Sequence, residues 1–197
     1  MPNRDYIQTV AHELIKKYDT RDPFELCKAI GVEVFYADLG SLKGMYKYLK
    51  KNRFAVINEK LDSYSKTLVC AHELGHDILH QDLAKRVCLQ EFMLYDMKSR
   101  PEYEANLFAS EILLPDDKIL TLAHDGYDIE QIAKALSIDI NLVAIKISSL
   151  NTRGYQFNNV IDVKSDFLSF FAIGKQKASA GRTAQVMLKY YRSLRKA

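Results

Sequence analysis

The sequence predicts an α+β fold, in which a small, mostly antiparallel sheet of three strands packs on a helical core and extra helices follow. Segments rich in β-branched and aromatic residues are confined to residues 32–58, and nearly all later periodicity is helical. Strands and helices are therefore segregated along the chain. The chain has 197 residues, of which 48% are apolar, and this is enough to bury one hydrophobic core without disulfides.

Two helices are predicted before the strands. Apolar residues recur at three- and four-residue spacings over 6–18, which indicates one buried helical face. In the segment DPFELCKAIG, Asp22 can cap a second helix, Pro23 suits its first position and Gly31 can end it.

The strand segments are Val32–Tyr36, Gly44–Leu49 and Arg53–Asn58. The polar connection Lys50-Lys51-Asn52 predicts that the last two segments form a hairpin. Because Arg53–Asn58 comes shortly before the next helix, it is a candidate sheet edge that could bind an extended substrate peptide by β-augmentation.

Helical periodicity dominates the rest of the chain up to about residue 150. The predicted helices are 64–80, 101–113, 116–124, 128–136 and 139–150, with breaks at Pro101, Pro115 and Asp125-Gly126. We divide the chain into a domain over 1–150 and an extension over 151–197, in which Val186–Leu194 is expected to form a final helix.

Charge is distributed unevenly between these two parts. The whole chain carries +3, but residues 151–197 contain nine Lys and Arg against two Asp and so carry +7, which leaves −4 for residues 1–150. The extension is either a solvated segment or a contact for an acidic partner, and nucleic acid binding through it is not favoured.

No apolar run approaches the ~18 residues of a membrane span, and three cysteines without a CxxC pair fit a reducing compartment. A cytoplasmic protein without a membrane partner is expected.

The segment TLVCAHELGHDILH contains the motif His72-Glu73-x-x-His76 within a predicted helix. Residues four apart lie on one helical face, so both imidazoles can bind one metal ion. Glu73 is one step round the helix and does not need to bind the metal. It is therefore the candidate general base of a zinc-dependent hydrolase.

A catalytic zinc usually has three protein ligands, and the third is not obvious from the motif. The metzincin pattern is excluded, because Leu79 stands where glycine is required and Asp82 stands where the third histidine is required. His80 is two turns from His72, a rise of ~12 Å, which favours a supporting or packing role over direct binding.

The remaining route is a carboxylate from the later helical segment PEYEANLFASEILLP. It offers Glu102, Glu104 and Glu111, and periodicity alone does not choose among them.

The pairing of AHELGH with EANLFASEILLP about thirty residues later closely resembles the ImmA/IrrE family of metallopeptidases. Where that family has Leu-Leu-Met-Pro, this chain has Ile112-Leu113-Leu114-Pro115. The resemblance implies a zincin-like domain with Zn²⁺ bound by His72, His76 and Glu104, the glutamate of the E-A-N triplet, with Glu102 as the alternative.

The resemblance also implies a function. Members of this family are cytoplasmic bacterial and phage proteins that act as anti-repressors or stress regulators. We therefore expect a zinc metallo-endopeptidase that cleaves a specific protein, with a helix-turn-helix transcriptional repressor as the first candidate. The alternative is a non-catalytic, zinc-stabilised regulator that binds a transcription factor or DNA.

Residues 131–147 have the spacing of a helix-turn-helix, but the second helix would begin with Asp139 and contains only Lys146 as a basic residue, which favours helix packing over DNA contact. A donor that stabilises the oxyanion of the tetrahedral intermediate is also needed, and its candidates are His124, Tyr46 and Tyr127.

Overall fold

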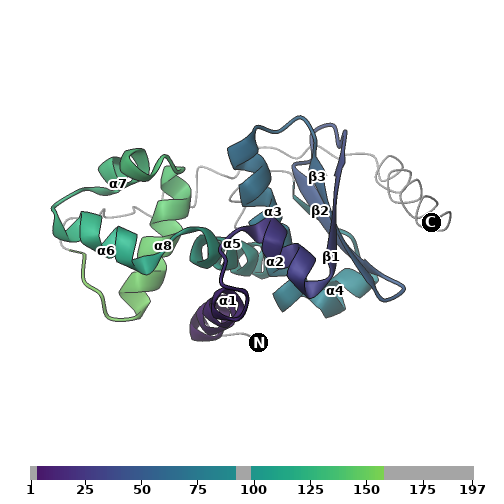
Figure 1. Cartoon of the computed structure of the whole chain (residues 1–197), viewed down its shortest axis with the longest axis horizontal. Helices are drawn as coiled ribbons and strands as arrows, with labels where there is room; N and C mark the ends of the chain where they lie inside the picture. The colour runs from purple at the N-terminus through teal and green to yellow at the C-terminus, as the bar shows by residue number, and fades with distance from the viewer. Residues whose placement is uncertain (1–3, 92–98, 158–197) are drawn as a thin grey trace.

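The computed structural model describes residues 4–91 and 99–157 (Figure 1). The elements in these residues are α1 (Arg4–Tyr18), α2 (Pro23–Ile30), β1 (Val32–Ala37), β2 (Gly44–Leu49), β3 (Asn52–Asn58), α3 (Ser63–Leu79), α4 (Gln81–Arg86), β4 (Leu89–Glu91), α5 (Arg100–Leu113), α6 (Asp116–His124), α7 (Ile129–Leu136) and α8 (Ile140–Thr152). The expected helix 186–194 and most of the basic extension lie outside the described residues.

The sheet lies at one end of the molecule, and α6, α7 and α8 lie together at the other (Figure 1). Between them, α3 and α5 pack against each other, with α3 facing the sheet and α5 facing α8. The α+β class is thereby confirmed, and α3 and α5 are the two elements on which the metal ligands were predicted.

The sheet differs from the prediction, because it has four strands in the order β1-β3-β2-β4 and is mixed. β2 is antiparallel to both β3 and β4, whereas β1 is parallel to β3. The β2–β3 hairpin places β3, not β2, beside β1, so the strand that follows β1 in sequence is not its neighbour. β4 has only three residues, and a segment this short shows no alternation that would predict a strand.

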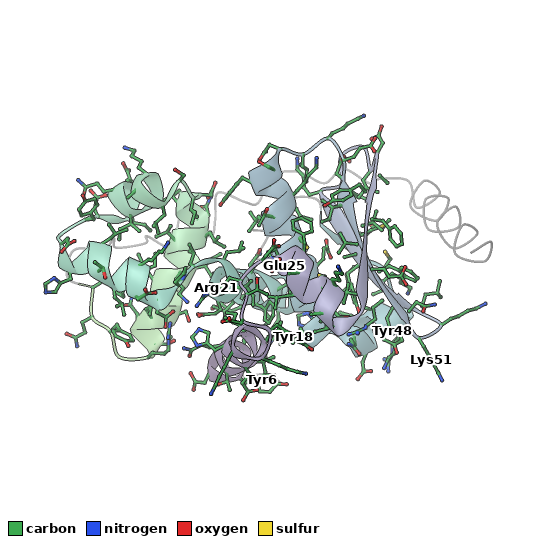
Figure 2. All side chains as sticks on the ribbon, viewed as in Figure 1. Tyr6, Tyr18, Arg21, Glu25, Tyr48 and Lys51 are labelled. Atoms are coloured by element: carbon green, nitrogen blue, oxygen red, sulfur yellow. The ribbon has the colours of Figure 1, made fainter. Side chains whose placement is uncertain are left out.

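β3 is paired on both sides, so the prediction that it offers a free edge for a substrate is wrong. Its residues Phe54–Ile57 are all buried, as expected of a strand with both faces covered. The hairpin loop is Lys50-Lys51, both at positive φ, and Asn52 belongs to β3. Lys51 and Tyr48 mark the free end of this hairpin (Figure 2).

Local capping explains several helix boundaries. The Asp22 side chain accepts a hydrogen bond from the Phe24 backbone N–H (2.8 Å), and Gly31 adopts the left-handed conformation that ends α2, as predicted. At the other end of the molecule, Asp128 and Gln131 form a capping box that begins α7.

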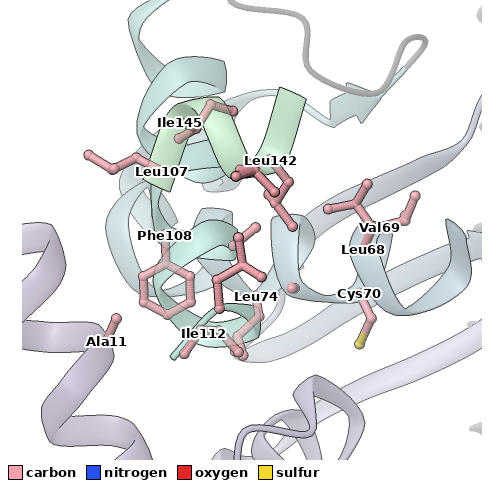
Figure 3. Close-up of a cluster of buried hydrophobic side chains, with 14 of the residues drawn as sticks. Ala11, Leu68, Val69, Cys70, Leu74, Leu107, Phe108, Ile112, Leu142 and Ile145 are labelled. Atoms are coloured by element: carbon pink, nitrogen blue, oxygen red, sulfur yellow. The ribbon is translucent and has the colours of Figure 1, made fainter. Parts of the chain in front are cut away.

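The hydrophobic core is built around α3 and α5. Leu74 of α3 and Phe108 and Ile112 of α5 are fully buried, and Leu142 of α8 packs above them (Figure 3). Residues from α1, including Ala11, close the other side of the cluster. This core fixes the relative position of the two helices that carry the predicted site.

α7 and α8 have the short connection of a helix-turn-helix, with Ser137 in the left-handed conformation at the turn. Between Leu142 and Leu150, however, Ser148 is the single residue of α8 that is exposed. A helix buried on most of its circumference has no free face to insert into a DNA groove. Helix packing is therefore the role of this segment, as the sequence favoured.

A buried ionic network joins α8 to the end of α5. The ammonium group of Lys146 contacts the Glu111 carboxylate and lies 2.5 Å from Asp116 Oδ1, and the side chains of Lys146 and Glu111 are both fully buried. Ser149 donates a hydrogen bond to Glu111 Oε1 (2.6 Å), and Arg153 pairs with Asp116 Oδ2 (2.5 Å). His12, Glu111 and Asp116 are close enough to suggest a metal site, but Lys146 already supplies the cation between the two carboxylates.

Arg21 adds a second link to the end of α5. Its guanidinium donates to the backbone carbonyl oxygens of Glu111 (2.9 Å) and Ile112 (3.0 Å) from the α1–α2 connection (Figure 2). These carbonyls belong to the last turn of α5, where a cation is favourable.

The network predicts a specific pH dependence of stability. Burial would raise the pKa of Asp116, but hydrogen bonds from Arg153 and Lys146 outweigh burial and lower it from 3.8 to about 2. A carboxyl group with a depressed folded-state pKa stabilises the fold above its unfolded pKa, and this contribution is lost as the pH falls through the folded pKa. Asp116→Asn should therefore lower the melting temperature at pH 6, and its difference from wild type should shrink between pH 4 and pH 2. Circular dichroism melts across this range test it, and a pH-independent difference would contradict it.

No helix in the described ranges is both long enough and apolar enough to cross a lipid bilayer.

Candidate metal centre

α3 presents His72 and His76 on one face, one turn apart, as the motif predicts. Both side chains are about 2% exposed, and the ring centroids lie 4.7 Å apart in an edge-to-face arrangement. Asp62 caps the start of α3 by accepting a hydrogen bond from the Ser65 backbone N–H (2.9 Å). The helix is thus begun by a local cap and held in place by core packing.

The carboxylate that meets these two imidazoles belongs to Glu102. Its Oε2 lies 3.1 Å from His72 Nε2, and its Oε1 lies 3.5 Å from His76 Nε2. One ligand atom from each of the three residues lies within 4.8 Å of the other two. This is the geometry required for three side chains to bind one metal ion.

Glu104 does not reach the two imidazoles of the motif. Its carboxylate lies on His80 Nε2 (2.9 Å) and on Arg100 Nε (2.6 Å). The structure therefore brings together His72, His76 and Glu102. Glu104, the predicted third ligand, contacts His80, which in turn contacts His76.

The packing of α5 on α3 explains this arrangement. A Cβ on Gly75 would lie 3.1 Å from Ala105 Cα, so the two helices approach each other closely at this pair. Glu102, Ala105 and Asn106 share one face of α5, since they are three and four residues apart, whereas Glu104 lies about 200° from Glu102. The small residue Ala105, on the same face of α5 as Glu102, is the sequence signal that could have favoured Glu102 over Glu104.

Each imidazole is also held through its second nitrogen. His72 Nδ1 lies 3.0 Å from Asn106 Oδ1, and His76 Nδ1 lies 3.0 Å from His80 Nδ1. The amide oxygen of Asn106 can only accept, so His72 carries a proton on Nδ1, and in the neutral imidazole the lone pair of Nε2 faces the Glu102 carboxylate. A bound cation would satisfy both this lone pair and the carboxylate, so the residues fit a metal ion.

The ionisation states match this conclusion. Burial lowers the pKa of His76 to about 4, against the opposing effect of Glu102, so this imidazole is neutral at pH 7. Burial would raise the pKa of Glu102, but its contacts with His72 and His76 outweigh burial and lower it, so the carboxylate is ionised. Neutral imidazole and ionised carboxylate are the forms that bind metal ions.

Glu73, the predicted base, is fully buried and faces the start of β2. A Cβ on Gly44 would lie 2.5 Å from Glu73 Oε1 and would also overlap Val69 Cγ1. The absence of a side chain at Gly44 therefore leaves the space that the Glu73 carboxylate occupies.

Gly44→Ala should accordingly displace the Glu73 carboxylate, and with Glu73 as the predicted base the rate of hydrolysis should fall roughly 100-fold, the effect of a shift of about 1 Å in a catalytic group. The rate and the metal content are compared with wild type, and a thermal melt shows that the variant is folded. Unchanged turnover in a folded Gly44→Ala protein would contradict the tight fit.

The structure brings none of the three candidate oxyanion donors to the His72–His76–Glu102 cluster. The Tyr46 hydroxyl donates a 2.5 Å hydrogen bond to Asp77 Oδ1, and burial together with this bond raises the pKa of Tyr46. His124 and Tyr127 are exposed and belong to the α6–α7 region, at the far end of the molecule from the sheet (Figure 1). All three positions are consistent with structural or surface roles.

Comparison with known proteins shows the family of the chain. Residues 27–148 match the peptidase M78 family, described as the IrrE N-terminal-like domain. The chain is 36% identical over 141 residues to uncharacterized immunity region protein 2 of Bacillus phage phi105, which covers 71% of this chain and 88% of that protein. It is also 28% identical over 149 residues to Metallopeptidase ImmA of Bacillus subtilis (strain 168), which covers 74% of this chain and 86% of that protein. The match includes both helices that build the His72–His76–Glu102 cluster, and the chain belongs to the ImmA/IrrE family, whose domain is the IrrE N-terminal-like peptidase domain.

Proposed function

We propose that this protein is a zinc-dependent endopeptidase that acts in the cytoplasm on a helix-turn-helix repressor of a phage or mobile element. The observation that carries the proposal is the convergence of His72, His76 and Glu102, with Glu73 as the next residue on α3. Two histidines and one glutamate form a ligand set typical of catalytic zinc in peptidases. One relative is named a metallopeptidase, which supports the proposed activity, and the other is named a phage immunity region protein, which supports the proposed role in phage repressor control.

In the proposed mechanism, His72 and His76 would hold zinc through Nε2 and Glu102 would hold it through its carboxylate. When bound, the zinc ion supplies the Lewis acidity that makes water nucleophilic near neutral pH. Glu73 accepts a proton from the attacking water on its carboxylate, and the water oxygen forms a bond to the carbonyl carbon. Glu73 then transfers this proton to the amide nitrogen as the C–N bond breaks.

The metal requirement and the substrate are tested together. Purified protein is incubated with the helix-turn-helix repressor encoded nearest to it, first as isolated, then after removal of metal by a chelator, and finally after addition of Zn²⁺. Two repressor fragments are expected in the first and third samples and intact repressor in the second. Casein, as the control substrate, should remain largely uncut, because a regulatory peptidase has narrow specificity.

Intact repressor in all three samples would overturn the proposed cleavage. If this intact repressor were also found in a stable complex with the protein, the non-catalytic regulator would replace the peptidase as the proposed function.

A further inference from the structure

His80, Glu104 and Arg100 lie outside the set of proposed metal ligands but form a continuous chain of contacts that ends on His76. His76 Nδ1 lies 3.0 Å from His80 Nδ1, His80 Nε2 lies 2.9 Å from Glu104 Oε2, and Glu104 Oε1 lies 2.6 Å from Arg100 Nε. The side chains of His80 and Glu104 are 8% and 6% exposed, whereas that of Arg100 is 54% exposed. The chain therefore runs from the molecular surface to the metal centre.

The partners in this chain determine the position of each proton. The Glu104 carboxylate, paired with the Arg100 guanidinium, can only accept, so His80 must carry its proton on Nε2. In the neutral imidazole, His80 Nδ1 is then an acceptor, and it requires a proton on His76 Nδ1. His76 Nε2 is left with a lone pair, which faces the Glu102 carboxylate at 3.5 Å.

With both imidazoles neutral, the opposite assignment leaves the chain unsatisfied. If His76 carried its proton on Nε2, its Nδ1 would need a proton donated by His80 Nδ1. A neutral His80 would then have Nε2 as a bare acceptor 2.9 Å from the Glu104 carboxylate. Two acceptors at that distance repel each other, so Glu104 selects the form of His76 that can bind a metal ion.

The backbone makes this chain rigid. His80 ends α3 and begins α4, its N–H donates to the His76 carbonyl oxygen (2.9 Å), and its own carbonyl accepts from the Ala84 N–H (3.0 Å). The rings of His76 and His80 lie one helical turn apart, with centroids 5.2 Å from each other. A partner fixed in this way restricts rotation of the His76 ring as well as its tautomer.

We propose that Glu104 and Arg100, acting through His80, are positioning residues that hold His76 in its metal-binding tautomer and orientation and so raise the affinity of the site for zinc. This inference rests on the proposed metal centre. It gives Glu104, the glutamate of the E-A-N triplet, a role that differs from binding the metal directly. Hydrogen-bonded partners of this kind typically contribute 10–100-fold to metal affinity.

The test is the Zn²⁺ dissociation constant, measured by competition with a chromophoric chelator. Glu104→Leu and His80→Phe should each weaken zinc binding roughly 10–100-fold. Glu104→Gln should recover most of the loss, because its side-chain carbonyl can still accept the His80 Nε2 proton. Arg100→Gln, at a largely exposed position that does not threaten folding, should weaken binding by a smaller factor. The matched control is Glu130→Leu, at an exposed acidic residue of α7.

A second readout separates positioning from general destabilisation. In metal-free protein, ¹⁵N chemical shifts of the imidazoles should show His76 protonated on Nδ1 in wild type and a mixture of tautomers in Glu104→Leu. Unchanged zinc affinity in both Glu104→Leu and His80→Phe, alongside a large loss in Glu102→Gln, would overturn this inference and leave the proposed metal centre intact. A wild-type protein that binds no zinc would overturn both.

Discussion

Replacing Glu73 by glutamine is expected to lower the rate of peptide-bond hydrolysis roughly 10²–10⁴-fold, the usual contribution of a general base. Glutamine has nearly the same shape, so it fits the space opposite Gly44, but its amide cannot accept the proton of the attacking water. Glu73 is not one of the three side chains that converge on the metal position, so the zinc content should match that of wild type.

The rate is measured by the appearance of repressor fragments over time, and zinc is measured in the same preparations. Glu59→Gln provides the matched control, because Glu59 is an exposed glutamate that follows β3. A Glu73→Gln protein that keeps its zinc and more than a tenth of the wild-type rate would exclude Glu73 as the base.

Replacing Lys146 by methionine is expected to lower the free energy of unfolding by about 3–5 kcal/mol, the usual effect of removing one partner from a buried ion pair. The substitution keeps most of the apolar stem but leaves the Glu111 carboxylate without its ammonium partner, and both side chains are fully buried. Because Glu111 and Glu102 belong to the same helix, this loss also weakens the support of the metal centre.

Urea unfolding curves provide the measurement, with Lys134→Met, at an exposed lysine of α7, as the control that should change little. The double variant Lys146→Met/Glu111→Leu should regain much of the lost stability, because it removes both buried charges. A loss below 1 kcal/mol in Lys146→Met alone would show that the network contributes little to stability.

Local signals in the sequence were sufficient to predict the two histidines and the described helices other than α4, a six-residue helix for which no helix was predicted. Helix ends depend on nearby residues such as Asp22 and Gly31, and the His72–His76 spacing depends only on the pitch of one helix. The end of α7 is also local, since Ser137 adopts the left-handed conformation there, where glycine is more common.

The strand order could not be predicted in the same way, because it depends on contacts between distant segments. The apolar pattern of the hairpin does not state which of its two strands lies beside β1. Parallel pairing of β1 with β3 is therefore a property of the assembled sheet.

The rotation of α5 about its axis determines which glutamate faces the two imidazoles. Glu102 and Glu104 are two residues apart, and their side chains point to different sides of α5. The contact between Gly75 and Ala105 sets the rotation of α5 against α3, and this turns Glu102 towards the two imidazoles and Glu104 towards His80. His80, for which the sequence favoured a supporting or packing role, lies beside His76 in the position that such a role requires.

The most direct test of the proposed metal centre is the anomalous scattering of zinc in crystals of the zinc-loaded protein, with data collected on both sides of the zinc absorption edge. One strong peak is expected about 2.0–2.2 Å from His72 Nε2, His76 Nε2 and a carboxylate oxygen of Glu102. A peak bound by Glu104, or no peak between α3 and α5, would contradict the proposed metal centre.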